Sequence, residues 1–450
     1  MSPDGKSWTF SLHKGVPFHF GFGEFTAKDV AHTHSLMVRN DATSTFSSFW
    51  KGTEKLEVVD DYQIVFRMKN PAVTMPFVAS RGGDFMPVSK AQWDREGIDG
   101  LDKKPAGTGS YQYAGRKLGE SIVLERVEKH WRGESPEFKE LELRWAREDA
   151  TRLALLLSQE AHVADLPRDL REQAAKRGVG NTISSVLPSV HLAIYFGGQY
   201  HTKGDPKFQA DVAWNDKRVR QAMNMAINRK ELRDALFKGV GDPVYVTGFY
   251  PSLEGWDPSW EKRFDELYGY NPTRAKALLE QAGHRPGAIK GTFWVYPRAE
   301  VPNLPQVLEG LGIYFKAVGI DMKLVDIEFP KTTALRRDKE SSCCLFGLVP
   351  SYRPVESLYL IHHSTKGTSH SFEDDFIQGK LLALGDAVDP KERDRLAREM
   401  GNHMFEEFAT MPLFAFFVDV VANPKVVESW AFPGYAAAGV SHFSLIKAAR

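Results

Sequence analysis

The sequence has very little cysteine: its 450 residues include two, Cys343 and Cys344, and these are neighbours. Neighbouring Cα atoms lie about 3.8 Å apart, whereas disulfides usually join Cα atoms that are about 4.4–6.8 Å apart. We therefore expect two small, buried hydrophobic side chains on a strand, with a redox switch as the alternative. No framework of disulfides is expected to hold the fold together.

Long apolar runs and an excess of one charge are also absent. No apolar run approaches the roughly 18 residues that cross a bilayer, and no basic segment followed by an apolar one stands at the N-terminus. Lys and Arg together number 58, as do Asp and Glu, so the chain has no net positive field that would attract phosphate backbones. We expect no nucleic-acid partner and no targeting or anchoring segment within these residues.

The common catalytic motifs are missing as well. The sequence contains no G-x-S-x-G elbow, no G-x-x-x-x-G-K-[ST] loop, no G-x-G-x-x-G after a strand and no H-E-x-x-H. His32 and His34, like His362 and His363, are spaced so that their imidazoles diverge, and a transition-metal site needs three or four converging ligands. The sequence therefore predicts a protein that is not an enzyme and has neither a metal site nor a cofactor.

Composition and patterning indicate a folded chain of more than one domain. Hydrophobic residues make up 42% and charged residues 26%, as in ordinary globular proteins, and the length suggests two or three domains. Residues 2–145 contain mostly strand patterns, such as Trp8, Phe10 and Leu12 alternating with polar residues. The run VHLAIYFGG at 190–198 predicts a strand that is covered on both faces.

Helix signals follow that strand. A periodic apolar pattern predicts one long helix that Asp216 caps and Gly239 ends, and a second helix that begins at Asn271 and stops at Gly283. A further helix ends at Gly319 and leads into a strand. Strands alternating with helices are typical of an α/β fold.

Four stretches of the chain together resemble one family. The sequence resembles solute-binding protein family 5, the peptide-type substrate-binding proteins of bacterial ABC importers, over residues 2–448 and in these segments: SPDGKSWTFSLHKGVPFH, PAGTGSYQY, DKRVRQAMNMAINRKEL and YNPTRAKALLEQAG. The resemblance implies an α/β, two-lobed periplasmic-binding-protein-like fold. It would be of the class II type, with three subdomains as in cluster C, a ligand cleft between the lobes and a hinge.

The resemblance also implies a division of the chain. It assigns 1–140 to a β-rich subdomain of lobe I, 141–245 with 426–450 to the α/β core of lobe I, and 246–425 to lobe II. Crossing segments near Val244–Tyr250 and Asn423–Trp430 would form the hinge. Members of the family carry an export signal and further strands ahead of the point that corresponds to Met1. A cytoplasmic protein that never had them is the alternative.

The implied function is that of an extracytoplasmic binding protein. It would trap a peptide-like or other small ligand by hinge closure and deliver it to the permease subunits of an ABC importer. We expect a monomer that is periplasmic or lipid-anchored at the cell surface after export. The alternatives are a sensory or regulatory ligand-binding protein on the same fold, and a binder of oligosaccharides or metal chelates in place of peptides.

The resemblance places the ligand-binding residues on two strands and one loop. The predicted residues are Tyr195, Phe196, Phe329, Arg336, Gly347, Ser351, Tyr352, Arg353 and Glu356. Peptide binders of the family typically show G-W-x-x-D-Y in the loop, where the aspartate holds the peptide's amino group. Here the loop reads GLVPSY, with Ser351 in place of the aspartate.

This substitution changes the expected ligand. A peptide amino group is expected to bind poorly unless Glu356 or another acid replaces the aspartate, since a buried ammonium needs a counterion. Arg336, Arg353 and Tyr352 are candidates to receive a carboxylate or a hydroxyl-rich ligand. For each of them a surface charge or a strut between lobes is the alternative.

Overall fold

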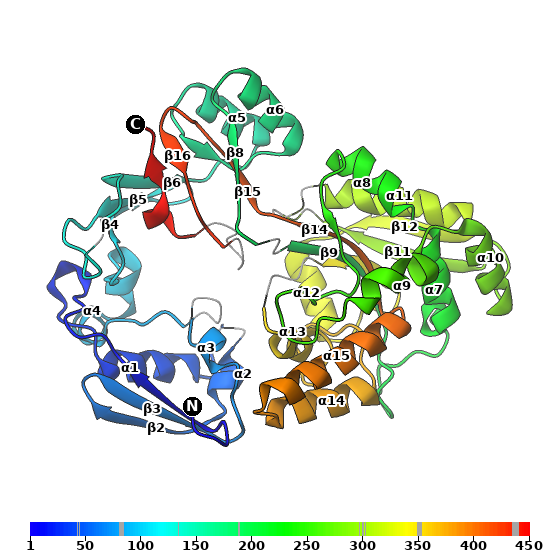
Figure 1. Ribbon diagram of the computed structural model, residues 1–450, viewed down its shortest axis with the longest axis horizontal. Helices are drawn as coiled ribbons and strands as arrows, with labels where there is room; N and C mark the ends of the chain where they lie inside the picture. Colours follow the sequence, from blue (N-terminus) through cyan, green and yellow to red (C-terminus); the bar gives the residue numbers. More distant parts are fainter. Residues whose placement is uncertain are drawn as a thin grey trace. The chain divides into compact units, whose positions relative to one another are not determined.

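The structure is a computed structural model in two compact units. It describes residues 1–42, 44, 46–80, 85–133, 135–187, 190–296, 298, 301, 303–348, 353–433 and 441–450, except for the side chain of residue 168. Unit 1 consists of Met1–Val186 and the described residues from Asp419 to the C-terminus, and unit 2 consists of Leu187–Val418 (Figure 1). Within the described part, no helix has the length and apolar character needed to cross a membrane.

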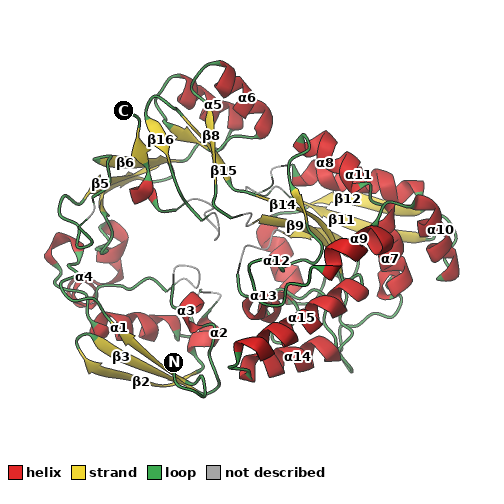
Figure 2. Cartoon of the chain, viewed as in Figure 1, coloured by secondary structure: helices red, strands yellow, loops and turns green. Residues whose placement is uncertain are grey.

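Unit 1 is rich in strands, as predicted (Figure 2). Its elements in chain order are β1 (Ser7–Ser11), η1 (His19–Gly21), α1 (Ala27–Met37), α2 (Ser47–Trp50), β2 (Thr53–Asp60), β3 (Gln63–Met68), α3 (Met75–Val78), α4 (Lys90–Lys103), β4 (Tyr111–Lys117), β5 (Ser121–Arg126), β6 (Glu140–Arg144), α5 (Asp149–Leu157), β7 (Val163–Ala164), α6 (Arg168–Lys176), β8 (Asn181–Ser184), β15 (Asp419–Ala422), β16 (Val427–Ser429), η4 (Phe443–Leu445) and β17 (Lys447–Ala448).

These strands form separate small sheets with the orders β1-β3-β2, β4-β5-β6, β7-β15-β8 and β16-β17. The predicted alternation is visible in β3, where Ile64, Phe66 and Met68 are buried in one core cluster. A capping box closes the N-terminus of α1, in which the Thr26 amide donates to the Asp29 carboxylate at 2.8 Å.

Unit 2 alternates strands and helices. Its elements are β9 (Val190–Phe196), η3 (Ala213–Asn215), α7 (Lys217–Ala226), α8 (Arg229–Phe237), β10 (Asp242–Pro243), α9 (Ser259–Tyr268), α10 (Pro272–Gln281), β11 (Ile289–Val295), α11 (Leu304–Ala317), β12 (Ile320–Asp326), α12 (Phe329–Arg337), β13 (Cys344–Leu348), α13 (Val355–His362), α14 (Asp375–Asp386), α15 (Pro390–Glu406) and β14 (Thr410–Phe416).

One six-stranded mixed sheet organises unit 2, in the order β10-β14-β9-β13-β11-β12. β11 is parallel to β12 and β13, and α11 and α12 connect these strands, whereas β9 is antiparallel to both of its neighbours. Every residue of β9 is buried, which confirms the strand predicted from its continuous apolar run. The sheet order places β9 and β13, which carry three predicted site residues (Tyr195, Phe196 and Gly347), next to each other inside the sheet.

The predicted long helix is two helices. Asp216 caps α7 as expected, but Ile227 is extended at φ −86° and ψ 115° and the helix stops at Ala226. Asn228 then caps α8 by accepting a hydrogen bond from the Glu231 amide, so a capping residue interrupts an apolar pattern that continues through it. The second predicted helix, α10, begins after Asn271 as expected.

The boundary between the units differs from the predicted one. We assigned 141–245 to lobe I, but residues 187–245 group with unit 2, because β9 pairs with β13 and β14. The chain passes from one unit to the other at Val186–Leu187 and at Val418–Asp419, while Val244–Tyr250 lies within unit 2. The hinge segments stay a prediction.

The cysteines also differ from the main expectation. Cys343 and Cys344 form a disulfide, whereas we expected two unlinked, buried side chains. Cys344 is buried at the start of β13, and Cys343 is exposed in the turn before it. The redox switch that we named as the alternative stays untested.

Candidate ligand site in unit 2

Three aromatic rings on neighbouring strands form a platform on one face of the central sheet. Phe346 of β13 is paired with Tyr195 of β9 on one side and with Trp294 of β11 on the other. Its ring stacks on Tyr195 at 6.1 Å and on Trp294 at 5.6 Å between centroids. Phe196 follows Tyr195 and therefore points to the opposite face, where it is paired with Leu345 in the core.

Arg336 of α12 lies over this platform. Its guanidinium carbon is 5.4 Å from the centroid of Phe346, and the residue is only 3% exposed. Its hydrogen bonds go to neutral groups: the hydroxyls of Ser369 and Thr333 and the carbonyl of Thr332. Burial lowers the pKa of Arg336. None of the ion pairs between described residues includes Arg336, so among these residues its buried charge has no counterion.

Side chains of α13 complete the cluster. The rings of His362 and His363 lie 6.4 Å and 6.3 Å from that of Tyr195, and the ring of Tyr359 lies 4.6 Å from that of His363. Burial lowers the pKa of His362 well below its usual value. Electrostatic interactions with His363, Arg336 and Arg353 lower the pKa further. Burial likewise raises the pKa of Tyr195 and of Tyr359, so all three groups are neutral at pH 7.

Several polar atoms of this cluster have no partner. The hydroxyls of Tyr195 and Tyr359 and Nδ1 of His362 are buried and form no hydrogen bond with any described residue. Buried polar groups are nearly always hydrogen-bonded, because an unmade bond costs about 1–3 kcal/mol. The arginine cluster, which we define as Tyr195, Arg336, Phe346, Tyr359 and His362, therefore has a charge and three polar atoms to offer to another molecule.

Of the predicted site residues, Tyr195 and Arg336 come together here, whereas Gly347 faces the Leu304 side chain on the other side of the sheet. Gly347 follows Phe346 on β13, and its carbonyl accepts a hydrogen bond from the Tyr296 hydroxyl. Arg353 precedes α13, and its charge acts on His362. Ser351 and Tyr352 lie outside the described residues.

Phe329 and Arg336 differ from the prediction in their secondary structure. We placed them on a strand, but both belong to α12, whose first residue is Phe329. The Phe329 ring is half-buried and packs 5.5 Å from that of Tyr296, with the Arg298 guanidinium 4.2 Å above it. The helical geometry puts Phe329 and Arg336 seven residues apart on one face, which lets both reach the same side of the sheet.

Glu356 is used elsewhere. Its carboxylate pairs with Arg393 of α15 at 2.7 Å, and Arg393 also pairs with Glu254 at 3.1 Å. Burial raises the pKa of Glu356, and the charge of Arg393 opposes the shift. Since Arg393 already neutralises this carboxylate, the structure gives no support to Glu356 as the substitute for the missing aspartate.

Sequence reasoning missed Phe346, Tyr359 and His362. The HH pair at 362–363 was the available signal for His362, but its spacing argued only against a metal site. Among the described residues no group of three or more His, Cys, Asp or Glu side chains is placed to hold a metal ion. From the sequence alone, Tyr359 and Phe346 cannot be distinguished from ordinary core residues. Only their place in the arginine cluster of the folded protein indicates a role in the site.

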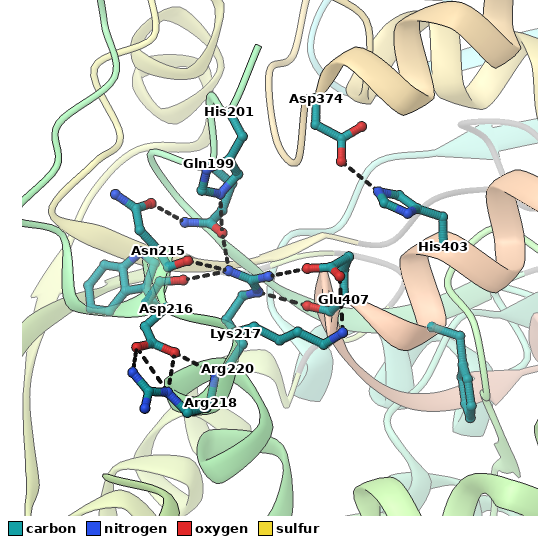
Figure 3. A network of polar contacts seen from close by, with 12 residues as sticks. Gln199, His201, Asn215, Asp216, Lys217, Arg218, Arg220, Asp374, His403 and Glu407 are labelled. Carbon is teal, nitrogen blue, oxygen red and sulfur yellow. Dashed lines mark hydrogen bonds and ion pairs between the residues drawn. The ribbon is translucent and has the colours of Figure 1, made fainter. Parts of the chain in front are cut away.

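A second buried arginine shows how this chain satisfies such a group when it is structural. Arg220 of α7 is 2% exposed and donates to Gln199, to the carbonyls of Trp214 and Asn215, and to Glu407 (Figure 3). Its ion pair with the Glu407 carboxylate spans 3.0 Å. Arg220 thus has a counterion, whereas none of the carboxylates described in the structure pairs with Arg336.

Comparison with known proteins identifies the family. Residues 1–369 match the family described as bacterial extracellular solute-binding proteins, family 5 Middle. The chain is 25% identical to heme-binding protein A of Haemophilus influenzae over 376 residues, covering 77% of this chain and 64% of that protein. It is 23% identical to the glutathione-binding protein of Salmonella choleraesuis, covering 96% of this chain and 82% of that protein. The chain thus spans about two thirds of the length of the first of these relatives.

Solved structures show the same fold. The protein NikA of Brucella suis in complex with Fe(III)-EDTA gives a TM-score of 0.79 at 19% identity, with 99% of this chain and 89% of that chain covered. The periplasmic binding protein DppA of Helicobacter pylori in complex with the peptide STSA gives 0.75 at 24% identity, with 100% and 87% covered. The mixed α/β fold is therefore that of the periplasmic binding proteins, and the chain belongs to family 5 of the bacterial extracellular solute-binding proteins.

Proposed function

We propose that this protein is the solute-binding component of an ABC importer and that its ligand presents a carboxylate to Arg336. The observation that carries the proposal is a guanidinium that is 3% exposed and has no carboxylate partner among the described residues. A buried, uncompensated charge is costly. A ligand carboxylate that binds a guanidinium by two parallel hydrogen bonds offsets that cost.

The family's ligands agree with this chemistry. The relatives are named or solved with heme, glutathione, a peptide and an EDTA chelate, and each of these compounds carries carboxylate groups. The partnerless hydroxyls of Tyr195 and Tyr359 are suited to the same group or to its neighbours, since each can donate one hydrogen bond.

The amino group of a peptide is less favoured than its carboxylate as the group that this site recognises. Ser351 stands where an aspartate would hold an ammonium group, and Glu356 is paired with Arg393. We infer a binding protein that recognises its ligand by the acidic end. Hinge movement between the two units would enclose the ligand outside the cytoplasm, and a permease would receive it from the enclosed form.

The test compares ligands that differ only in the acidic group. Melting temperature and calorimetric affinity are measured with short peptides as free acids and as C-terminal amides, and with glutathione and its diethyl ester. We expect at least one free acid to raise the melting temperature and its uncharged derivative to lose the effect.

Two variants test whether Arg336 is the residue that binds the acidic group of the ligand. Arg336→Gln is expected to weaken the affinity of the acid by about tenfold or more, as for loss of a charged hydrogen bond. Arg337→Gln is the matched control, because Arg337 is the next residue and its exposed side chain pairs with Asp338. Equal binding of acid and amide, or unchanged affinity in Arg336→Gln, would contradict the proposal.

A further inference from the structure

The two edge strands of the six-stranded sheet in unit 2 differ in length and composition. At one edge, β10 has two residues, Asp242 and Pro243, and a short edge strand that contains proline resists the addition of a further strand. At the other edge lies β12 (Figure 1), which has seven residues and no proline. Of these two edges, that of β12 is the one long enough to pair with another strand.

The hydrogen bonds of the sheet show which backbone groups of β12 point outward. The Ile327 amide, just after β12, donates to the Val295 carbonyl of β11, and the Thr292 amide of β11 donates the opposite way, to the Cys343 carbonyl. Because backbone groups alternate in direction along a strand, the odd-numbered residues of β12 bond toward β11 and the even-numbered ones point away from the sheet. Within the described part of the chain, no backbone hydrogen bond reaches these outward groups.

The side chains of β12 are exposed over most of its length. Leu324 and Val325 are 47% and 43% exposed, and Asp321 and Lys323 are exposed as well. None of the ion pairs between described residues includes Asp321 or Lys323, although Lys290 of β11 lies beside Asp321 in the sheet. A charged residue on an edge strand usually opposes pairing, so a strand that binds here has to supply the opposite charge at the facing position.

The sequence of β12 supplies that charge to a second copy of itself. In an antiparallel pair of two copies centred on Met322, Asp321 of each copy faces Lys323 of the other. Directly opposite residues of opposite charge stabilise an antiparallel pair. In the same register Ile320 faces Leu324 and Met322 faces its counterpart, so the other face of the pair is apolar.

The backbone directions select this register. Facing residues of an antiparallel pair either both bond to the partner strand or both bond away from it, and centring on Met322 places outward-pointing residues opposite each other. A centre between two residues would set outward groups against inward ones. A centre at Asp321 or at Lys323 would set two like charges against each other, which is destabilising.

We propose that β12 is a surface at which a second copy of this protein binds, edge to edge and antiparallel. The same residues of both copies would form the interface, as a two-fold axis requires, and the two six-stranded sheets would continue into one another. The pairing involves residues 320–324 of each copy, so the interface is small and the dimer weak. This proposal departs from the monomer that we expected from the sequence, and it does not depend on the ligand proposed for Arg336.

The test measures association as a function of protein concentration. Sedimentation equilibrium of 1–450 is expected to show a dimer with a Kd of about 10–500 µM, as for a weak interface. Hydrogen exchange is then measured below and above that concentration. The outward amides of Met322 and Leu324 are expected to exchange about tenfold more slowly in the dimer, as for a hydrogen bond gained. The amides of Asp321 and Lys323, which bond to β11, are the internal control and are expected to exchange at the same rate in both samples.

Exchange of the two charges tests the register. Lys323→Asp and Asp321→Lys each set like charges opposite one another, and each is expected to weaken association by about tenfold or more. The double variant restores opposite charges in reversed order and is expected to associate as the unchanged protein does. Asp326→Lys is the matched control, because it alters the charge of the same exposed strand outside residues 320–324, and it is expected to leave the Kd unchanged.

Each result supports or overturns the proposal. A protein that stays monomeric up to about 1 mM, or a double variant that associates no better than the single ones, would overturn it. A dimer without slower exchange at Met322 and Leu324 would form at another surface and would overturn it as well. Ligand affinity is measured in the same variants and is expected to stay unchanged, because β12 contributes no residue to the arginine cluster, so failure of one proposal does not imply failure of the other.

Discussion

Arg220 and Glu407, which lie on α7 and just after α15, form an ion pair of 3.0 Å in which the arginine is buried and the glutamate is partly exposed, and the Nε atom of Arg220 also donates to the Glu407 carbonyl at 2.8 Å. Arg220 thereby holds the first helix of unit 2 against the segment that leads into β14. The motif DKRVRQAMNMAINRKEL that marks the family contains this arginine, so part of that signature has a structural role.

Replacing Arg220 is expected to destabilise the protein. In Arg220→Met, three backbone carbonyls and the Gln199 side chain lose the hydrogen bonds that Arg220 donates, and the Glu407 carboxylate loses a buried partner. Breaking a buried pair from one side costs about 3–5 kcal/mol, which denaturant unfolding would measure. Lys217→Met is the control, because this half-exposed lysine pairs with the same carboxylate and is expected to contribute about 1 kcal/mol or less.

Replacing Arg336 is expected to increase the stability of the ligand-free protein, in contrast to replacing Arg220. Because the buried Arg336 has no counterion in the part of the chain that the structure describes, Arg336→Met is expected to raise the free energy of unfolding of the ligand-free protein by about 1–2 kcal/mol while abolishing ligand binding. Arg393→Met, which breaks pairs with Glu254 and Glu356, is expected to lower it. A destabilised Arg336→Met protein would show that Arg336 is a structural residue.

Acid is expected to destabilise unit 2 through its buried histidines. Burial lowers the pKa of His191 from 6.5 to about 3 and that of His363 to about 4. Between these values and pH 6.5 the unfolded chain binds the protons, so stability falls as the pH decreases through that window. His191 contributes a loss of about 2 kcal/mol at pH 5 relative to pH 7.5.

A single variant checks this contribution. His191→Phe keeps the stacking on Tyr250, whose ring centroid lies 3.8 Å away, and removes the titrating group. Unfolding measured from pH 4 to pH 8 is expected to depend less on pH in this variant. Parallel curves for the two proteins would exclude the contribution of His191.

Gly197 is expected to tolerate no side chain. It follows β9, and a Cβ atom there would lie 1.8 Å from the Ser341 carbonyl oxygen and 2.7 Å from that of Cys344. Gly197→Ala is therefore expected to cost about 3 kcal/mol or more, at the upper end of overpacking. Gly379→Ala is the contrast, because Gly379 is an exposed position in α14 with open space around it and is expected to gain about 0.5–1 kcal/mol. Thermal unfolding of both proteins checks the difference.

The cysteine pair is expected to react only after reduction. Cys343 and Cys344 are joined, so iodoacetamide is expected to leave the folded protein unlabelled. After mild reduction the exposed Cys343 is expected to be alkylated before the buried Cys344, as peptide mass spectrometry would show. Labelling without reductant would contradict the disulfide.

Local signals predicted the local structure well. Asp216 and Asn271 cap helices as expected, because a capping residue acts within one turn of its own position. The break after Ala226 was missed since the apolar period continues across it and conceals the cap at Asn228. Periodicity reports which face is buried and does not report whether the helix continues.

The site was harder to predict than the fold. Tyr195 and Arg336 followed from family resemblance, but their contact with His362 joins three separate elements. No spacing in the sequence encodes such a contact, because the sheet order that produces it comes from pairing between distant strands. The absence of an ion pair between Arg336 and any described carboxylate is likewise a property of the folded chain.

The position of β9 in its sheet has a consequence for synthesis. β9 lies between β13 and β14, so a nascent chain leaves the ribosome with this largely apolar strand about 150 and 220 residues before its two partners. Pairing over such separations is slow, since long loops must close first. The emerging polypeptide therefore has a prolonged period in which β9 is free to aggregate, and we expect a chaperone to bind it until Thr410–Phe416 has been made.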